Sequence, residues 1–279
     1  METTKEFRNH KILNHTIIGG ILLLAFAILL FPNIVQIFSF GTYHILGNLI
    51  PVTLVPDLCE IGLTVLIWII YRKWFQGQFQ GGFVRENLKK GLLMIALPTI
   101  LLAGMNMVGI AAYGIGNIPA ALVMGIAPGI FEEVAFRGLI ISNSMRTVNS
   151  YKGIVLVLIS TSVSFGLVHF MNILAGADVN QTITQVCYAI GLGCIFAAAY
   201  LRTGNLWVTV IAHSAIDTSA FLTKGLQQAS GVLTESTSQI DWTMVSMGIA
   251  FAIIGLFFIR PSKKGEILQV WNKRWHKEN

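Results

Sequence analysis

Eight apolar runs of about twenty residues each decide what this chain of 279 residues can fold into. A membrane hydrocarbon core about 30 Å thick is crossed by about 20 helical residues. The runs lie at residues 17–40, 54–74, 91–113, 118–140, 153–171, 182–201, 205–222 and 243–260. Long apolar runs predict helices, because in lipid a helix satisfies all of its own backbone hydrogen bonds. We expect an all-α, polytopic membrane protein of about eight transmembrane helices, with one transmembrane domain over residues 1–279.

The composition excludes the soluble and nucleic-acid-binding classes. Hydrophobic residues make up 54% of the chain and charged residues 11%, whereas soluble domains carry about 25% charged residues. The net charge is +6, but the basic residues are scattered between the apolar runs and do not form one polar domain. We therefore expect the lipid bilayer, and not nucleic acid, as a partner. Cys59, Cys187 and Cys194 form no CxxC motif, and no disulfide framework is expected.

The basic residues predict how the chain sits in the cell membrane. With the N-terminus in the cytoplasm, 17 of the 19 Lys and Arg residues fall in cytoplasmic segments, as short cytoplasmic loops favour. The exceptions are Lys224, in an outside loop, and Arg137, inside the fourth run. Both termini are therefore expected in the cytoplasm. The tail, residues 261–279, is basic and amphipathic, which is typical of a helix anchored at the membrane surface.

Three charged residues lie close together in the fourth run, at Glu132, Glu133 and Arg137. Unpaired charges there would together cost on the order of 10 kcal/mol, so each needs a partner or a function. On a helix Glu133 and Arg137 lie about 40° apart, whereas Glu132 and Arg137 lie about 140° apart. We expect Glu133 to pair with Arg137, which leaves Glu132 free to act as a general base. The alternative is an ion-pair network that only locks helices together.

Two histidines lie in other apolar runs. His169 follows Phe165 by four residues, and Asp217 follows His213 by four, so each pair shares a helical face. A lone membrane histidine usually hydrogen-bonds a neighbouring helix, but two histidines with a glutamate pair favour one site in the bundle interior. At 1.5 Å per residue, Glu132 and His213 lie about 12 Å deep and His169 about 24 Å. A shared site then requires the fifth run to tilt or to begin later.

Together these residues resemble the CPBP family of intramembrane proteases, also called CAAX-protease and bacteriocin-processing or Abi proteins. Motifs of soluble zincins and serine hydrolases, HExxH and GxSxG, are absent from the chain. Three motifs match the family in order: EExxxR at Glu132, Glu133 and Arg137; FxxxH at Phe165 and His169; and Hxxx(N/D) at His213 and Asp217. They fall within residues 118–222, which we take as the CPBP-like catalytic core.

The resemblance implies an intramembrane endopeptidase that acts on a membrane-associated peptide or protein, as family members do on prenylated CAAX proteins. It implies Glu132 as the base that activates water and His169 as a residue that holds the water. His213 and the residue four positions later would stabilise the oxyanion. That residue is Asp217 here, where studied members have asparagine. An ionised aspartate cannot donate to an oxyanion, so Asp217 must be protonated, orient His213, or bind a metal.

The cofactor and the function class leave alternatives. Glu132, His169 and His213 could supply the two-histidine, one-carboxylate set of a metalloprotease, with a divalent metal such as zinc, or they could position water without a metal. A non-catalytic bacteriocin-immunity or scaffolding protein of the same fold is the alternative to a protease. A proton-coupled transporter is a third reading, but the internal repeats common in transporters are missing.

Overall fold

The structure is a computed structural model that describes residues 41–42, 45, 55–74, 82–174, 176–223 and 239–275. The described residues form helices joined by short connections, with two isolated bridges and no strand among them. The expected first run, residues 17–40, lies outside the described residues. The all-helical class predicted from the sequence is confirmed for the part of the chain that the structure describes.

The helices follow the predicted runs closely. They are α5 (Val55–Trp74), α6 (Leu88–Tyr113), α7 (Ile118–Glu132), the π-helix η2 (Glu133–Ile141), α8 (Ser142–Met145), α9 (Tyr151–Val168), α10 (Met171–Leu174), α11 (Val179–Thr203), α12 (Leu206–Phe221), α14 (Trp242–Phe258), the 3₁₀ helix η3 (Pro261–Lys263) and α15 (Lys264–Arg274). Several begin at a side-chain cap. Asn117, Ser150 and Asp178, for example, each accept a hydrogen bond from a backbone amide of the first turn.

Fewer helices than expected qualify as membrane spans. Four of the described helical segments are long and apolar enough to cross a membrane, or five if α14 and the bent η3–α15 segment count as one span. The prediction of eight spans is therefore not confirmed. Two expected spans explain part of the difference: α12 has only 16 residues, and α5 carries Asp57, Glu60, Arg72 and Lys73. The structure and the apolar composition still support a multi-pass membrane protein.

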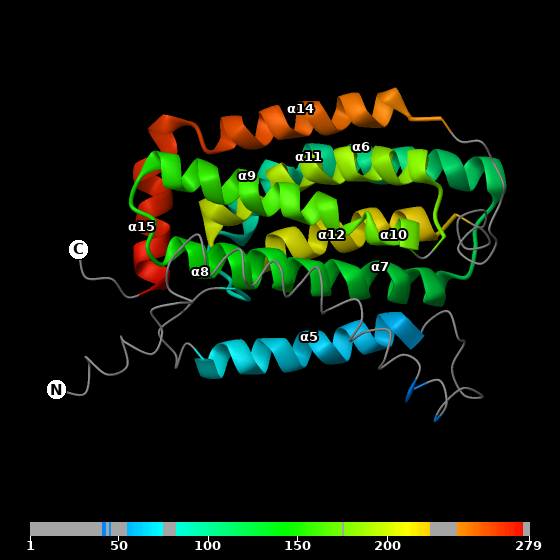
Figure 1. The fold of residues 1–279 in the computed structure, drawn as a ribbon, viewed down its shortest axis with the longest axis horizontal. Coiled ribbons are helices and arrows are strands. Elements are labelled where there is room, and N and C mark those ends of the chain that lie inside the picture. The colour runs from blue at the N-terminus through cyan, green and yellow to red at the C-terminus, as the bar shows by residue number, and fades with distance from the viewer. Residues whose placement is uncertain are drawn as a thin grey trace.

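The long helices run side by side as a bundle, and α15 crosses one end of it (Figure 1). α11 packs against α14 and α9, and α7 packs between α12 and α5. Small residues allow the closest of these approaches. A Cβ added to Gly125 would meet Thr218, and one added to Gly129 would meet Ser214, so α7 and α12 touch nearly backbone to backbone.

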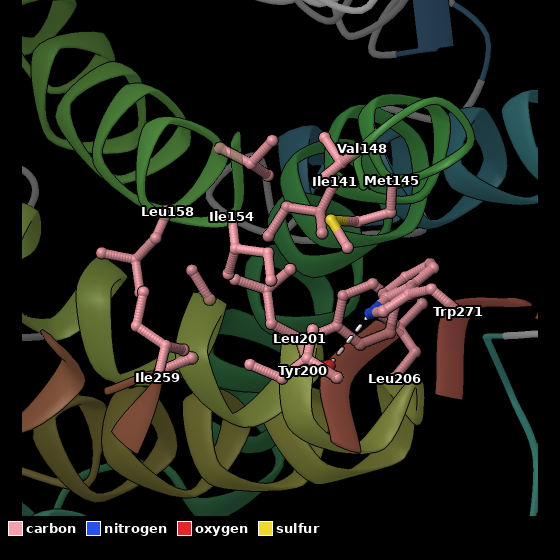
Figure 2. Packing of buried hydrophobic residues seen from close by; sticks show 14 of the residues in the cluster. Ile141, Met145, Val148, Ile154, Leu158, Tyr200, Leu201, Leu206, Ile259 and Trp271 are labelled. Atoms are coloured by element: carbon pink, nitrogen blue, oxygen red, sulfur yellow. Dashed lines mark hydrogen bonds between the residues drawn. The ribbon is translucent and has the colours of Figure 1, made fainter. Parts of the chain in front are cut away.

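The C-terminal tail differs from the sequence-based prediction. Its apolar side chains do not face outward as those of a surface anchor would. Ile267 and Trp271 are fully buried and Trp275 is 6% exposed, all within the main core cluster. Figure 2 shows Trp271 beside Tyr200, with its indole Nε1 donating to the carbonyl oxygen of Leu201 at 2.9 Å. The tail packs on the protein because the ends of α11 and the η2–α8 segment offer it an apolar surface.

Ion pairs hold α15 in this position. Glu266 accepts hydrogen bonds from Arg202 at 2.9 and 3.0 Å and a further one from Lys90. Near the other end of the helix, Glu86 lies 3.1 Å from both Lys273 and Arg274. α15 therefore joins the start of α6 and the end of α11 across one end of the bundle.

Candidate active site

The buried ion pair expected from the fourth run is present. Arg137 Nη1 lies 2.9 Å from Glu133 Oε1, and the two side chains are 1% and 0% exposed. The guanidinium also donates to the carbonyl oxygen of Gly193 at 3.4 Å and lies 4.3 Å from the centre of the Phe165 ring. Both charges are thus compensated by a partner, as membrane burial requires.

His213 of α12 connects both glutamates of this segment. Its Nδ1 lies 2.9 Å from Glu133 Oε1, the same oxygen that pairs with Arg137. Its Nε2 lies 3.7 Å from Glu132 Oε2 and 3.3 Å from Asp217 Oδ2. Four of the six candidate residues therefore meet around one imidazole ring, and Arg137 joins them through Glu133.

The hydrogen bonds of His213 constrain where protons lie. Glu133 is paired with Arg137 and can only accept, so His213 Nδ1 carries a proton and donates it. His213 Nε2 then faces two carboxyl groups, Glu132 and Asp217. One more proton is needed at this contact, either on Nε2 or on one of the two carboxyl groups. The three groups therefore share protons as a coupled set.

Glu132 is partly exposed and Glu133 is buried, which agrees with their expected positions on different faces of the helix. The Glu132 side chain is 24% exposed and that of Asp217 is 28% exposed, whereas Glu133 is fully buried. Glu132 and Asp217 can therefore contact a water or a substrate. Glu133 can contact only the protein.

His169 lies beside this cluster and is held through Phe165. Its Nδ1 lies 3.0 Å from the backbone oxygen of Phe165, a hydrogen-bond acceptor, so Nδ1 is the donor and a neutral ring keeps Nε2 free to accept. The Phe165 ring lies 5.5 Å from the His169 ring and 5.9 Å from the His213 ring, centre to centre. Both histidines thus border one aromatic side chain.

The expected difference in depth between His169 and Glu132 came in part from the boundary drawn for the fourth span. The expected fourth span ended at residue 140, but the helical segment continues to Met145, five residues farther. At 1.5 Å per residue, that extension places Glu132 about 7 Å deeper than expected. The fifth span begins at Tyr151 and not later, so the later start considered for it is wrong.

The proposed metal ligands do not converge. Among the residues that the structure describes, no three His, Cys, Asp or Glu side chains are arranged to hold one ion. Glu132 and His213 approach each other, but His169 does not complete a three-ligand group with them. The donor set therefore does not fit a catalytic zinc, which needs three protein ligands around one point.

Two features of the site were not foreseen. The segment from Glu133 to Ile141 is a π-helix, a rare form that is frequent at functional sites, and apolar periodicity over nine residues does not distinguish it from an α-helix. The carboxyl group of Glu60, on α5, interacts electrostatically with that of Glu132. Its position in an apolar run was the signal available in the sequence.

A comparison with known protein families gave a match that covers the candidate site residues. Residues 114–219 match the family model described as Type II CAAX prenyl endopeptidase Rce1-like. This segment is thus similar to the Rce1-like group of the CPBP family. The match covers the three motifs and every candidate residue from Glu132 to Asp217. The searches of curated proteins and of solved structures gave no match. An Rce1-like segment on a helical bundle supports a CAAX-type intramembrane protease.

Proposed function

We propose that this Rce1-like protein is an endopeptidase that cleaves a peptide bond of a membrane-associated peptide or protein by glutamate-activated water. The supporting observation is the approach of Glu132 Oε2 to His213 Nε2, at 3.7 Å, beside a fixed ion pair. A partly exposed carboxylate next to an oriented imidazole provides a base and a hydrogen-bond donor in one place.

The reaction begins at Glu132. Its carboxylate takes a proton from a water molecule as the water oxygen attacks the carbonyl carbon of the scissile bond. His213, protonated at Nε2, donates a hydrogen bond to the oxyanion that forms. When the carbon–nitrogen bond breaks, Glu132 returns the proton to the leaving amine. His169 Nε2, left free by the bond at Nδ1, accepts a hydrogen bond from the attacking water.

The remaining residues orient His213. Glu133 accepts from His213 Nδ1 and is itself held by Arg137. Asp217, 3.3 Å from Nε2, accepts the hydrogen bond of that nitrogen before substrate binds and so orients the ring. These steps use only side chains of this chain, because no three His, Cys, Asp or Glu side chains among the described residues form a metal-binding group.

We infer that both termini face the cytoplasm. The basic side chains of Lys90, Arg202, Lys263, Lys273 and Arg274 gather at the end of the bundle that α15 crosses, as their ion pairs with Glu86 and Glu266 show. Positive charge collects on the cytoplasmic side of membrane proteins. This end of the bundle therefore lies in the cytoplasm.

The deciding experiment compares Glu132→Gln with Glu86→Gln. The amide at residue 132 keeps the size of the side chain but cannot accept the proton of water, so cleavage should fall at least about a hundredfold. Glu86, 52% exposed on the surface, controls for the substitution itself. Cleaved membrane peptides are quantified by mass spectrometry in cells that produce each variant. Full cleavage with Glu132→Gln would remove Glu132 as the base, and no cleavage even with the wild type would favour a scaffolding role.

A further inference from the structure

The π-helix that carries Glu133 and Arg137 ends at Ile141, and the C-terminal segment contacts the next residue, Ser142, directly. Trp275, which follows α15, donates its indole N–H to the backbone oxygen of Ser142 at 3.0 Å. Trp275 is 6% exposed and belongs to the same core cluster as Ile141 and Met145. Residues far apart in the sequence thus meet where the π-helix returns to an α-helix.

The Ser142 carbonyl needs this donor. In a continuous α-helix the amide of Arg146 would bond the oxygen of Ser142, four residues earlier. Here that amide donates to Asn143 instead, at 3.2 Å. A buried carbonyl left without a partner costs about 1–3 kcal/mol, and the indole of Trp275 supplies the partner.

The side chain of Ser142 is held as well. Its hydroxyl lies 2.8 Å from the hydroxyl of Tyr200, on α11, and 3.4 Å from the backbone oxygen of Arg137. The π-helix is therefore fixed at both ends. The ion pair of Glu133 with Arg137 and His213 fixes its start, and the contacts of Ser142 fix its end.

We propose that Trp275 is a positioning residue for the candidate active site. By holding the Ser142 carbonyl, it keeps the π-helical register that sets the direction of the Glu132 and Glu133 side chains. A slip of one residue would turn them by about 100° around the helix axis. The effect on catalysis rests on the proposed peptidase function, but the effect on the π-helix does not.

The test is Trp275→Phe, matched with Trp271→Phe. Phenylalanine removes the indole donor and keeps a ring for Arg146, whose guanidinium lies 5.5 Å from the ring of Trp275. Trp271→Phe also removes one indole donor, but that donor bonds Leu201, outside the π-helix. The two variants therefore lose the same kind of bond at different places.

Two readouts separate the outcomes. Hydrogen exchange in residues 133–145 should become faster with Trp275→Phe and stay as in the wild type with Trp271→Phe. In addition kcat should fall about 10- to 100-fold with Trp275→Phe while KM is kept, because small misplacements of catalytic groups cost this much. Equal exchange in residues 133–145 in both variants would overturn the positioning role even if the protein shows no peptidase activity. Faster exchange with unchanged kcat would restrict Trp275 to stability and overturn the catalytic part.

Discussion

Glu133 Oε1 lies 2.9 Å from His213 Nδ1, which joins the π-helix η2 to α12 at the centre of the bundle. The same oxygen lies 2.9 Å from Arg137 Nη1. One carboxylate oxygen thus neutralises a buried guanidinium and fixes the orientation of a histidine. Glu133 therefore has a structural task that differs from the catalytic one proposed for Glu132.

Glu133→Gln should destabilise the protein, while Glu132→Gln should leave its stability nearly unchanged. Removing one partner of a buried ion pair costs about 3–5 kcal/mol, because the other charge stays buried alone. Glu132 is 24% exposed and has no such pair with Arg137. The measurement is the unfolding temperature of both variants in detergent. A stable Glu133→Gln beside an unstable Glu132→Gln would reverse the roles of the two glutamates.

Gly129→Ala should weaken the packing of α7 on α12. The added methyl carbon would lie 2.9 Å from the amide nitrogen of Ser214 and 3.0 Å from its Cα, and backbone atoms move less readily than side chains. Overpacking of this kind costs about 1–3 kcal/mol. Gly104→Ala in α6 is the matched control, since nothing lies within 4 Å of its added carbon. Equal unfolding temperatures for the two variants would contradict the tight α7–α12 contact.

Part of this arrangement could be predicted from the sequence because it depends on the spacing of a few residues within one helix or on their depth in the membrane. The i, i+4 spacing of Glu133 and Arg137 was enough to predict their pair, since helical geometry alone brings them together. The approach of Glu132 to His213 was expected from equal counted depths, although the longer fourth segment places Glu132 about 7 Å deeper than that count. Each of these depends on local geometry or on the membrane as a fixed reference.

The features that the sequence did not predict depend on packing between distant segments. The amphipathic pattern around Trp271 suits a membrane surface or a protein surface equally well, and only the apolar ends of α11 and η2 decide between them. The start of α12 is likewise tied to a distant segment, because the Asn205 side chain caps the helix and also donates to the backbone oxygen of Glu86. The hydropathy pattern of a segment does not predict which distant segments it will contact.

Cysteine labelling tests the proposed orientation. In a variant without the three native cysteines, Ser262→Cys should react with a membrane-impermeant maleimide only after the cell membrane is opened. Gln181→Cys should react in intact cells. Both residues are exposed. Ser262, in η3, lies at the end of the bundle that α15 crosses, and Gln181 lies at the opposite end, near the start of α11. The reverse pattern would place the termini outside.

The contact of Glu86 with α15 should depend on pH. The hydrogen bond from Lys273 and the charge of Arg274 hold the pKa of Glu86 below its ordinary value of 4.5. The contact therefore stabilises the folded state fully above about pH 4.5, and less as the pH falls through the lowered pKa. Because Glu86 is 52% exposed, the free energy of unfolding at pH 7 should be higher for the wild type than for Glu86→Gln by no more than about 1 kcal/mol. The measurement is unfolding of both proteins against pH, and a difference that stays constant down to low pH would contradict the ion pair.

Asp217→Asn tests the departure from the family pattern. Asp217 Oδ2 lies 3.3 Å from His213 Nε2, which favours an orienting role over direct contact with the oxyanion. An asparagine oxygen can still accept a hydrogen bond from His213, so we expect kcat to fall less than about tenfold, with an unchanged pH profile. Asp217→Ala removes the acceptor, so its kcat should be about tenfold lower than that of Asp217→Asn. An active-site hydrogen bond to a charged group contributes about 1.5–3 kcal/mol.

Other results would assign Asp217 a different role. If its carboxyl group donates to the oxyanion, Asp217→Asn should keep full activity at every pH, because an amide nitrogen is always a hydrogen-bond donor. If it binds a metal, purified wild type should contain about one metal ion per chain and Asp217→Asn should lose it, because a neutral amide is a poorer ligand than a carboxylate. The pH profile and the metal content of wild type and Asp217→Asn together distinguish the three roles. A metal-free wild type with a pH profile shared by Asp217→Asn is the result that orientation of His213 requires.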